Sequence, residues 1–260
     1  MICEHASSAL LAVDDPTPVG AFNLGASSPF LIVCDHAGRA VPASLGRLGL
    51  PDAAFETHIA SDLGVAPLAV RLSAPLGAGV ITQAFSRLVI DCNRAPGHPA
   101  SILAVSDGWP IPGNADLAAA DVDARVAEIH APYHRAIAAE LDARERAGRP
   151  TALICLHSFT PALAGQARPW HVGVLHLGDS ALCHALLAIL GREPDLVVGD
   201  NQPYAMDATD FTAPHHSAGR ALEVAELEIR QDLLADDPGV ARIAALLTRV
   251  LPLALEQARG

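Results

Sequence analysis

Phe30-Leu-Ile-Val-Cys-Asp-His36 is a short apolar run that ends on a histidine, and Ala152-Leu-Ile-Cys-Leu-His157 repeats this pattern about 120 residues later. Short runs rich in β-branched residues indicate buried, parallel strands. In an open α/β sheet the ligand crevice lies outside the carboxyl ends of such strands. We therefore expect His36 and His157 to meet at one edge of a sheet, although a strand that merely ends on a polar residue gives the same pattern.

The rest of the chain alternates between strand-like and helix-like segments. Further strands are expected at residues 79–85, 87–92, 171–177, 196–198 and 222–229, and helices at 114–148, 179–190 and 240–257. We expect Pro132 to kink or divide the first helix, and residues 97–113 and 199–220 to form loops. This order predicts a single α/β domain with a mixed, mainly parallel sheet flanked by helices. Residues 1–28 are expected to form an irregular lead-in to a folded domain over residues 29–260.

Composition excludes several classes of function. All 17 basic residues are arginines, which excludes Schiff-base chemistry, pyridoxal phosphate attachment and a P-loop lysine. A net charge of −12 argues against a nucleic-acid partner, so an anionic ligand would need locally placed arginines. No apolar run reaches transmembrane length, and the acidic start at Glu4, Asp14 and Asp15 does not resemble a signal peptide. The sequence predicts a cytoplasmic protein with no membrane partner.

The last predicted strand carries several carboxylates. Glu226, Glu228 and Arg230 share one face because side chains alternate along a strand. Two inward carboxylates would need charges or a metal to balance them. An edge strand with a solvated face is the alternative.

Arginines and histidines supply further candidates. Arg87 and Arg94 flank an apolar core, and a guanidinium can hold a carboxylate or an oxyanion. Salt-bridged structural arginines are the alternative. His130 and His134 have a spacing that could bind a metal, but without an H-E-x-x-H motif a buried, hydrogen-bonded pair is favoured. His215-His216 lies in a polar stretch and is expected to be solvated.

In combination, these segments resemble the N-formylglutamate amidohydrolase family. The matching segments follow the family order from about residue 29 to 235: Cys34-Asp-His-Ala-Gly38, Thr57-His-Ile-Ala-Ser-Asp-Leu-Gly64, Ser86-Arg-Leu-Val-Ile-Asp-Cys-Asn-Arg94, Pro132-Tyr-His134, Leu156-His-Ser-Phe-Thr-Pro161, Arg168-Pro-Trp-His171, Asp200-Asn-Gln-Pro-Tyr204 and Leu227-Glu-Ile-Arg-Gln-Asp-Leu233. The family is similar in fold to the zinc exopeptidases (phosphorylase/hydrolase-like fold), such as zinc carboxypeptidases and aspartoacylase-like deacylases. This similarity implies an eight-stranded mixed sheet, one zinc ion per chain and a catalytic domain over residues 29–260.

The resemblance also implies roles for single residues. His36 and His157 would bind the metal, Glu228 would be the general base and Arg87 would stabilise the oxyanion. Substrate binding would fall to Asn93, Arg94, Arg168 and Tyr204. The wider superfamily takes its third ligand from a His-x-x-Glu motif, but Arg39 stands at that position here. Asp62 is the first choice for the third ligand, and His58 is the second.

The function implied is zinc-dependent hydrolysis of the amide bond of a small, anionic N-acyl amino acid. N-formyl-L-glutamate, which would give formate and L-glutamate, is the first expectation. Another N-acyl amino acid or a small peptide remains open as the substrate. So does a non-catalytic member that only binds an acyl amino acid, although the retained candidate residues argue against it. The sequence does not determine the oligomeric state.

Overall fold

The two runs that carry histidines form neighbouring strands in the computed structural model, which describes residues 9–260. β2 (Phe30–Cys34) pairs in parallel with β6 (Ala152–Phe159), and every residue of both strands is buried. Long apolar side chains on both faces explain this burial, because a central parallel strand has helices on either side. Glu4, on which the signal-peptide argument partly rests, lies outside the described residues.

The described residues form one main sheet of seven strands in the order β1-β3-β2-β6-β11-β9-β10. Besides β2 and β6, this sheet contains β1 (Val19–Phe22), β3 (Gly79–Gln83), β9 (Val172–Leu175), β10 (Val198–Asp200) and β11 (Glu223–Arg230). Adjacent strands are parallel except at the β1–β3 and β9–β11 pairs. The mixed, mainly parallel sheet is therefore confirmed, whereas the expectation of eight strands is wrong for this part of the chain.

Two segments differ from the expected strands. Val19–Phe22 lies within the stretch expected to be irregular, but it pairs antiparallel with β3 at the edge of the sheet. The sequence predicts a strand over residues 87–92, but these residues form turns. The Val89 N–H donates to Ser86 O at 2.9 Å. The apolar side chains of residues 88–90 are buried in a separate cluster with Ile59, Phe85 and Ile111. Their burial explains the strand-like composition without any strand pairing.

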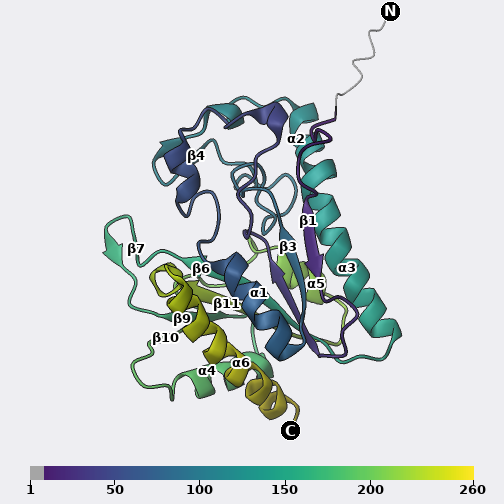
Figure 1. Cartoon of the computed structure of the whole chain (residues 1–260), viewed down its shortest axis with the longest axis vertical. Helices are drawn as coiled ribbons and strands as arrows, with labels where there is room; N and C mark the ends of the chain where they lie inside the picture. The colour runs from purple at the N-terminus through teal and green to yellow at the C-terminus, as the bar shows by residue number, and fades with distance from the viewer. Residues whose placement is uncertain (1–8) are drawn as a thin grey trace, which may run out of the picture.

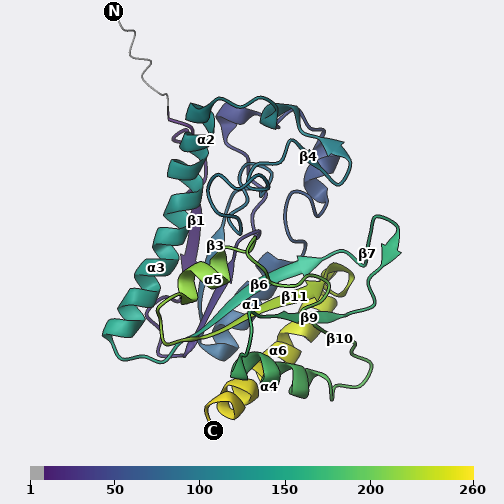
Figure 2. The ribbon, with the colours of Figure 1, turned by 180° about the vertical axis from the view of Figure 1, so that it is seen from behind.

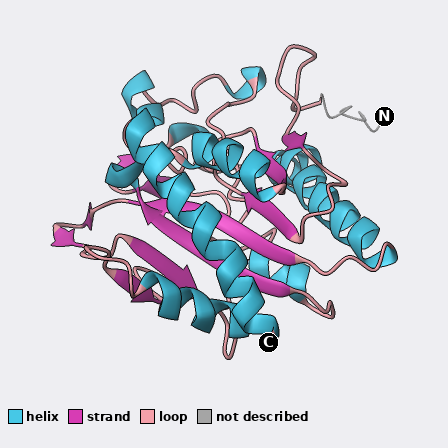
Figure 3. Cartoon of the chain, turned by 60° about the horizontal axis from the view of Figure 1, so that its bottom comes forward, coloured by secondary structure: helices cyan, strands magenta, loops and turns pink. Residues whose placement is uncertain are grey.

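Helices cover both faces of the sheet. Figure 1 shows α1 (Val65–Leu76), α4 (Ala181–Leu190) and α6 (Asp237–Arg259) on the near face, and Figure 2 shows α3 (Ala131–Arg146) and α5 (Thr212–Ser217) on the far face. Apolar side chains of the strands alternate between two core clusters, one under each helical layer. Figure 3 shows how the C-terminal helix crosses the strands. The three-layer arrangement leaves the carboxyl edge of the central strands for the loops.

α6 is the one helix of residues 9–260 that is long and apolar enough, by composition, to cross a membrane. Half of its apolar window is buried within the protein, where α6 packs on α1 and α4. Val240, Ile243 and Leu247 belong to the core cluster on this face of the sheet. The apolar character of α6 is thus accounted for by packing in the core.

The long helix expected from Asn114 begins later and is divided. α2 (Ala119–Arg125) passes through a π-helical turn (Val126–His130) into α3, so the predicted interruption near Pro132 is confirmed. Asn114 does not cap this helix, because its amide donates to Leu88 O and Leu103 O and its Oδ1 accepts from Arg125. The partners of Asn114 lie eleven or more residues away in the sequence, so the residues next to Asn114 do not indicate these contacts.

Short elements complete the chain. The 3₁₀ turns are η1 (Ala43–Leu45), η2 (Asp52–Glu56), η3 (Pro112–Asn114) and η5 (Gln231–Leu234). The two expected loops contain structure: β4 (Val105–Ser106) pairs with β5 (Trp109–Pro110) in the first, and α5 lies in the second. A further small hairpin, β7 (Ala162–Leu163) with β8 (Gln166–Ala167), follows β6.

Candidate active site

The candidate site lies where the connections of the sheet diverge. The chain leaves β2 towards β3 on one side, whereas it leaves β6 towards β9, beyond β11, on the other. A crevice opens at the carboxyl ends of strands at such a switch point. His36 follows β2 by two residues, and His157 lies near the end of β6. The topology therefore brings to one place two histidines that are far apart in the sequence.

Asp62 completes a compact group with these two histidines. One ligand atom each from His36, Asp62 and His157 lies within 4.8 Å of the others, and all three residues are buried. Asp62 Oδ2 lies 3.4 Å from His36 Nδ1 and 3.0 Å from His157 Nδ1. The Asp62 N–H donates to His36 O at 2.9 Å, which ties the segment before α1 to the end of β2.

The outer ring nitrogens face two more carboxylates. His36 Nε2 lies 2.7 Å from Asp91 Oδ1, and His157 Nε2 lies 3.2 Å from Asp35 Oδ2. A proton on each Nε2 would leave the Nδ1 lone pairs directed towards Asp62. Histidines that bind a metal are commonly oriented in this way by a carboxylate on the other nitrogen.

The electrostatics of this group favour a cation. Burial alone would lower the pKa of the His157 imidazole, but Glu226, Asp35 and Asp62 raise it well above its usual value. Burial would raise the pKa of the Asp62 carboxyl, but the two imidazoles hold it well below its usual range. His36 Nδ1 is buried without a hydrogen-bond partner among the described residues. Two imidazoles and one carboxylate are a donor set that fits zinc with one position left open.

Arg87 lies beside the group. Its Nη2 donates to Asp91 Oδ2 at 2.7 Å, and its Nη1 lies 3.4 Å from Asp62 Oδ1. The side chain keeps 29 % of its surface exposed, so the guanidinium still reaches the pocket. These two carboxylates fix the orientation of a cation whose remaining donors are available to a ligand.

Glu226 and Glu228 enter from the adjacent strand. β11 lies in the interior of the sheet between β6 and β9, which contradicts the edge-strand alternative. Glu228 pairs in register with His157, and both glutamates are buried, each with an Oε2 that has no hydrogen-bond partner among the described residues. Burial raises the pKa of each carboxyl to about 8. Carboxyls held in this way can exchange protons near neutral pH.

Arg168 and Tyr204 form a pair near these residues. Arg168 Nη1 donates to the Tyr204 hydroxyl at 2.9 Å, and the guanidinium carbon lies 4.7 Å from the centre of the Tyr204 ring. Tyr204 lines the same cavity as His157 and Glu228. His58, the second choice for a metal ligand, is not part of the buried group. Its Nε2 lies 3.3 Å from Asp107 Oδ2.

Asn93 and Arg94 are held by the segment that precedes α5. Asn93 Oδ1 accepts hydrogen bonds from the N–H groups of Phe211 and Thr212 at 3.0 and 2.9 Å. Arg94 Nη1 donates to Asp210 Oδ1 at 3.0 Å. Asn93 thus has a structural use that the sequence did not indicate, and Arg94 is already paired with a carboxylate.

The His130–His134 pair supports the same segment. His130 Nε2 donates to Arg94 O at 3.0 Å, and His134 Nε2 donates to Cys92 O at 2.9 Å. His134 Nδ1 must then accept from His216 Nε2, which lies 3.0 Å away. Burial lowers the pKa of His134 to about 4. The expectation of a buried, hydrogen-bonded pair is confirmed, whereas His216 is buried and the expectation that it is solvated is wrong.

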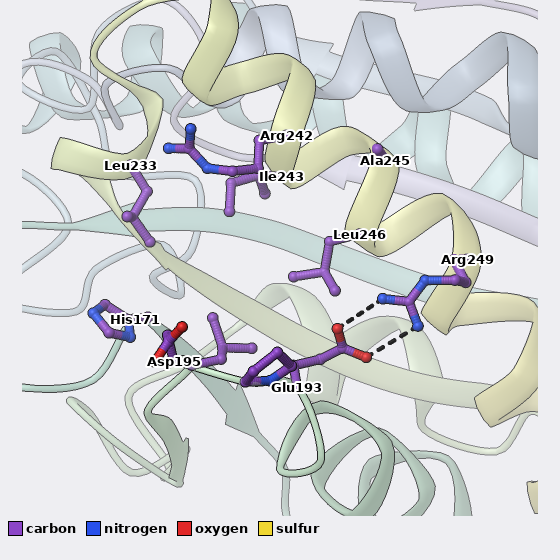
Figure 4. A pocket seen from close by; sticks show the side chains of 11 residues that line it. His171, Glu193, Asp195, Leu233, Arg242, Ile243, Ala245, Leu246 and Arg249 are labelled. Carbon is purple, nitrogen blue, oxygen red and sulfur yellow. Dashed lines mark hydrogen bonds and ion pairs between the residues drawn. The ribbon is translucent and has the colours of Figure 1, made fainter.

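All the candidate residues except Arg168 and His58 line one cavity of about 390 Å³. Its walls are mostly charged or polar: His36, Asp62, Arg87, Asn93, Arg94, His157, Ser158, Tyr204, Ala205, Asp207, Thr209, Asp210, Glu226 and Glu228. A second hollow, of about 460 Å³, lies between α6 and residues 193–196. Figure 4 shows that Ile243 and Leu246 point into this second hollow and that Arg249 pairs with Glu193 at its side. Possible metal ligands converge only in the first cavity, within the part of the chain that the structure describes.

Three residues of the site were missed by sequence reasoning. Asp35 and Asp91 stand behind the histidines, and Asp210 is paired with Arg94. Asp35 and Asp91 lie in the segments 34–38 and 86–94 that resemble the family, close to other candidates, so their position in the sequence was a signal for them. Asp210 lies in a segment without a motif, and only the folded chain brings it to Arg94.

Comparisons with known proteins agree with this architecture. The chain matches the family described as N-formylglutamate amidohydrolase over residues 28–235. The structure of a gene product from Agrobacterium tumefaciens is 34 % identical, with a TM-score of 0.93 over 96 % of this chain and 100 % of that one. An N-formylglutamate amidohydrolase from Ralstonia eutropha is 21 % identical, with a TM-score of 0.64 over 94 % of this chain and 100 % of that one, a likeness in fold. No curated protein matches the sequence. The family match over most of the chain and the relative at 34 % identity lead to one conclusion: this chain belongs to the N-formylglutamate amidohydrolase family.

Proposed function

We propose that this protein is a zinc-dependent amidohydrolase that cleaves N-formyl-L-glutamate to formate and L-glutamate. The observation that carries the proposal is the convergence of His36, Asp62 and His157 in the cavity that Glu228 and Arg87 also line. Family membership supports amide hydrolysis. Metal-assisted hydrolysis requires a set of metal-binding side chains, a carboxyl that can transfer a proton and a cation fixed in position, and the cavity contains a candidate for each.

His36 Nδ1, His157 Nδ1 and an Asp62 oxygen would hold the metal. Zinc, when bound, supplies a Lewis acid for the acyl oxygen and lowers the pKa of a water molecule. The hydrogen bond to Asp91 would keep His36 in the tautomer that leaves Nδ1 free, and the charge of Asp35, 3.2 Å from His157 Nε2, would favour the same tautomer in His157. These outer carboxylates also balance the positive charge that the site would gain.

Glu228 is proposed as the general base. Its Oε2 would accept a proton from the attacking water and deliver it to the nitrogen of the leaving amino acid. Burial raises the pKa of this carboxyl to about 8, and the positive charge of a bound metal would lower that pKa again and favour the carboxylate that acts as a base. The register of Glu228 with His157 places it at the same level of the sheet as the proposed metal ligands.

Arg87 is proposed to stabilise the oxyanion. Its ion pairs with Asp91 and Asp62 fix the guanidinium before substrate arrives, so little reorganisation is needed during the reaction. The acyl oxygen gains negative charge as water attacks, and a fixed donor interacts more strongly with that oxygen than with the neutral carbonyl.

Arg94 and Arg168 are the proposed partners of the two substrate carboxylates. Arg168 has no ion pair with a carboxylate among residues 9–260, and Tyr204 fixes its orientation. Asn93 would act mainly by holding the segment that carries Arg94. Local arginines of this kind allow a chain with a net charge of −12 to bind a dianion.

A formate-release screen tests the proposal. Zinc-loaded protein should release formate from N-formyl-L-glutamate faster than from N-formyl-L-alanine, and should release little acetate from N-acetyl-L-glutamate. Preference for the acetylated substrate would contradict the formyl assignment but not amide hydrolysis. Binding of N-formyl-L-glutamate without any product would instead indicate a non-catalytic member.

A further inference from the structure

The carboxylate partner of Arg94 belongs to the protein itself. Asp210 Oδ1 accepts from Arg94 Nη1 at 3.0 Å and from Asn93 Nδ2 at 3.4 Å. Both donors belong to the pair that the family resemblance assigns to the substrate carboxylate. The two charged side chains are 22 % and 12 % exposed, so this ion pair lies within the pocket wall and is only partly screened by water.

The main chain around Asp210 is anchored independently of this ion pair. Asn93 Oδ1 accepts from the N–H groups of Phe211 and Thr212, which fixes the segment immediately after Asp210. On the other side, the N–H of Asp210 donates to Asp207 O at 3.2 Å in a tight turn, a main-chain bond that does not depend on the Asp210 carboxylate. A rotation of the Asp210 side chain would therefore release Arg94 without moving the start of α5.

We propose that Asp210 is an internal competitor for the substrate carboxylate at Arg94. A guanidinium in the pocket wall without a counter-ion would be unfavourable, and Asp210 provides that counter-ion when no substrate is bound. An incoming carboxylate must displace Asp210 or bind beside it, and in both cases the negative charge of Asp210 opposes binding. The inference rests on the proposed function only in taking Arg94 as a carboxylate-binding residue.

This competition would act on product as well as on substrate. Hydrolysis of an N-acyl amino acid leaves the carboxylates of the substrate on the amino-acid product, so tight binding at Arg94 would retain that product equally well. Interactions that are the same in the ground and transition states do not raise the rate of the chemical step. Asp210 would weaken such uniform binding and let the amino acid leave.

The alternative is that Asp210 positions Arg94. Arg94 Nη1 also donates to Asn93 O and Thr209 O, at 2.7 and 3.3 Å, so two carbonyls hold the guanidinium in addition to the ion pair. Its Nε and Nη2 make no hydrogen bond within the described residues. The two interpretations predict opposite signs when the charge of Asp210 is removed.

The test is the affinity for L-glutamate of the zinc-loaded protein, measured by isothermal titration calorimetry. Asp210→Asn retains the shape and removes the charge, and Asp210→Ser serves as a second variant if the first is unstable. We expect either variant to bind L-glutamate about tenfold more tightly, the difference expected when a charge-assisted hydrogen bond loses its competitor. The matched control is Asp200→Asn, which removes one charge from the exposed start of the same connection, where Asp200 pairs with His176.

Further arms assign the effect to Arg94. The increase in affinity for L-glutamate should disappear when Arg94→Gln is combined with Asp210→Asn. L-Glutamine and L-isoglutamine each replace one carboxylate of L-glutamate by a carboxamide. The increase in affinity should be small for the analogue that lacks the carboxylate bound by Arg94. L-glutamate binding that is weakened or unchanged in both Asp210 variants, or that tightens equally in Asp200→Asn, overturns the proposal. Because the readout is binding, tighter binding without formate release would refute the proposed hydrolysis alone. Formate release with unchanged L-glutamate binding would refute only the role of Asp210.

Discussion

Replacing Glu228 with glutamine is the change that should most selectively remove catalysis. Glutamine has nearly the same shape as glutamate, but its amide cannot accept the proton of the attacking water. Glu228 is buried at the level of His157, and its Oε2 makes no hydrogen bond within the described residues, so the substitution breaks no hydrogen bond of that oxygen. We therefore expect folding and metal content to be retained.

The expected loss follows from the proposed role. General-base catalysis typically contributes ~10²–10⁴-fold, or about 3–5 kcal/mol of activation free energy, so kcat should fall by that factor with little change in KM. Formate release should be measured at equal zinc occupancy. The matched control is Glu226→Gln, two residues earlier on the same strand face. Burial raises the pKa of both carboxyls to about 8, so charge does not distinguish them. If only Glu228 accepts the proton of the attacking water, Glu226→Gln should change kcat little. An inactive Glu226 variant beside a fully active Glu228 variant would refute the assignment.

Three further predictions concern the surroundings of the site. Asp91→Asn should weaken zinc binding about 10–100-fold, because Asp91 orients His36; competition with a chelator measures this, and unchanged affinity would contradict it. Arg87→Gln should lower kcat by ~10²–10³-fold, as loss of an oxyanion donor does, while a change confined to KM would argue against that role. Burial lowers the pKa of His134 from 6.5 to about 4, so the unfolded chain takes up a proton first as the pH falls. The stability from this group should be fully present above pH 6.5, and the free energy of unfolding should decrease by about 3 kcal/mol towards pH 4. In urea unfolding, His134→Gln should lose less stability than the wild type as the pH falls, and equal losses would contradict this reasoning.

The convergence of His36 and His157 follows from physical rules that act on the sequence alone. Each histidine ends or nearly ends a run that is apolar on both faces, and parallel pairing of such runs places their carboxyl ends at one edge. Asp62 could be chosen from the family resemblance but not from spacing, because its place beside the histidines depends on the turn before α1. Its backbone hydrogen bond to His36 O is a contact between segments that are separate in the sequence.

Other features depend on tertiary packing and could not be foreseen in this way. Residues 87–92 have the composition of a strand, but their apolar side chains are buried in a cluster separate from the two cores of the sheet, and Arg87 and Asp91 lie beside His36. Glu226 and Glu228 were compatible with an edge strand until the sheet order placed β11 in the interior. The pairing of Arg94 with Asp210 joins residues more than a hundred positions apart and has no local signature.

The zinc stoichiometry of the purified protein tests the central claim most directly. After loading and removal of excess metal, elemental analysis should find one zinc ion per chain in the wild type. It should find essentially none in a His36→Ala, His157→Ala double variant that remains folded by circular dichroism. His184→Ala, which removes an exposed histidine from α4, should retain the full zinc content. Wild-type protein that retains no zinc, or a double variant that binds as much as the wild type, would contradict the account.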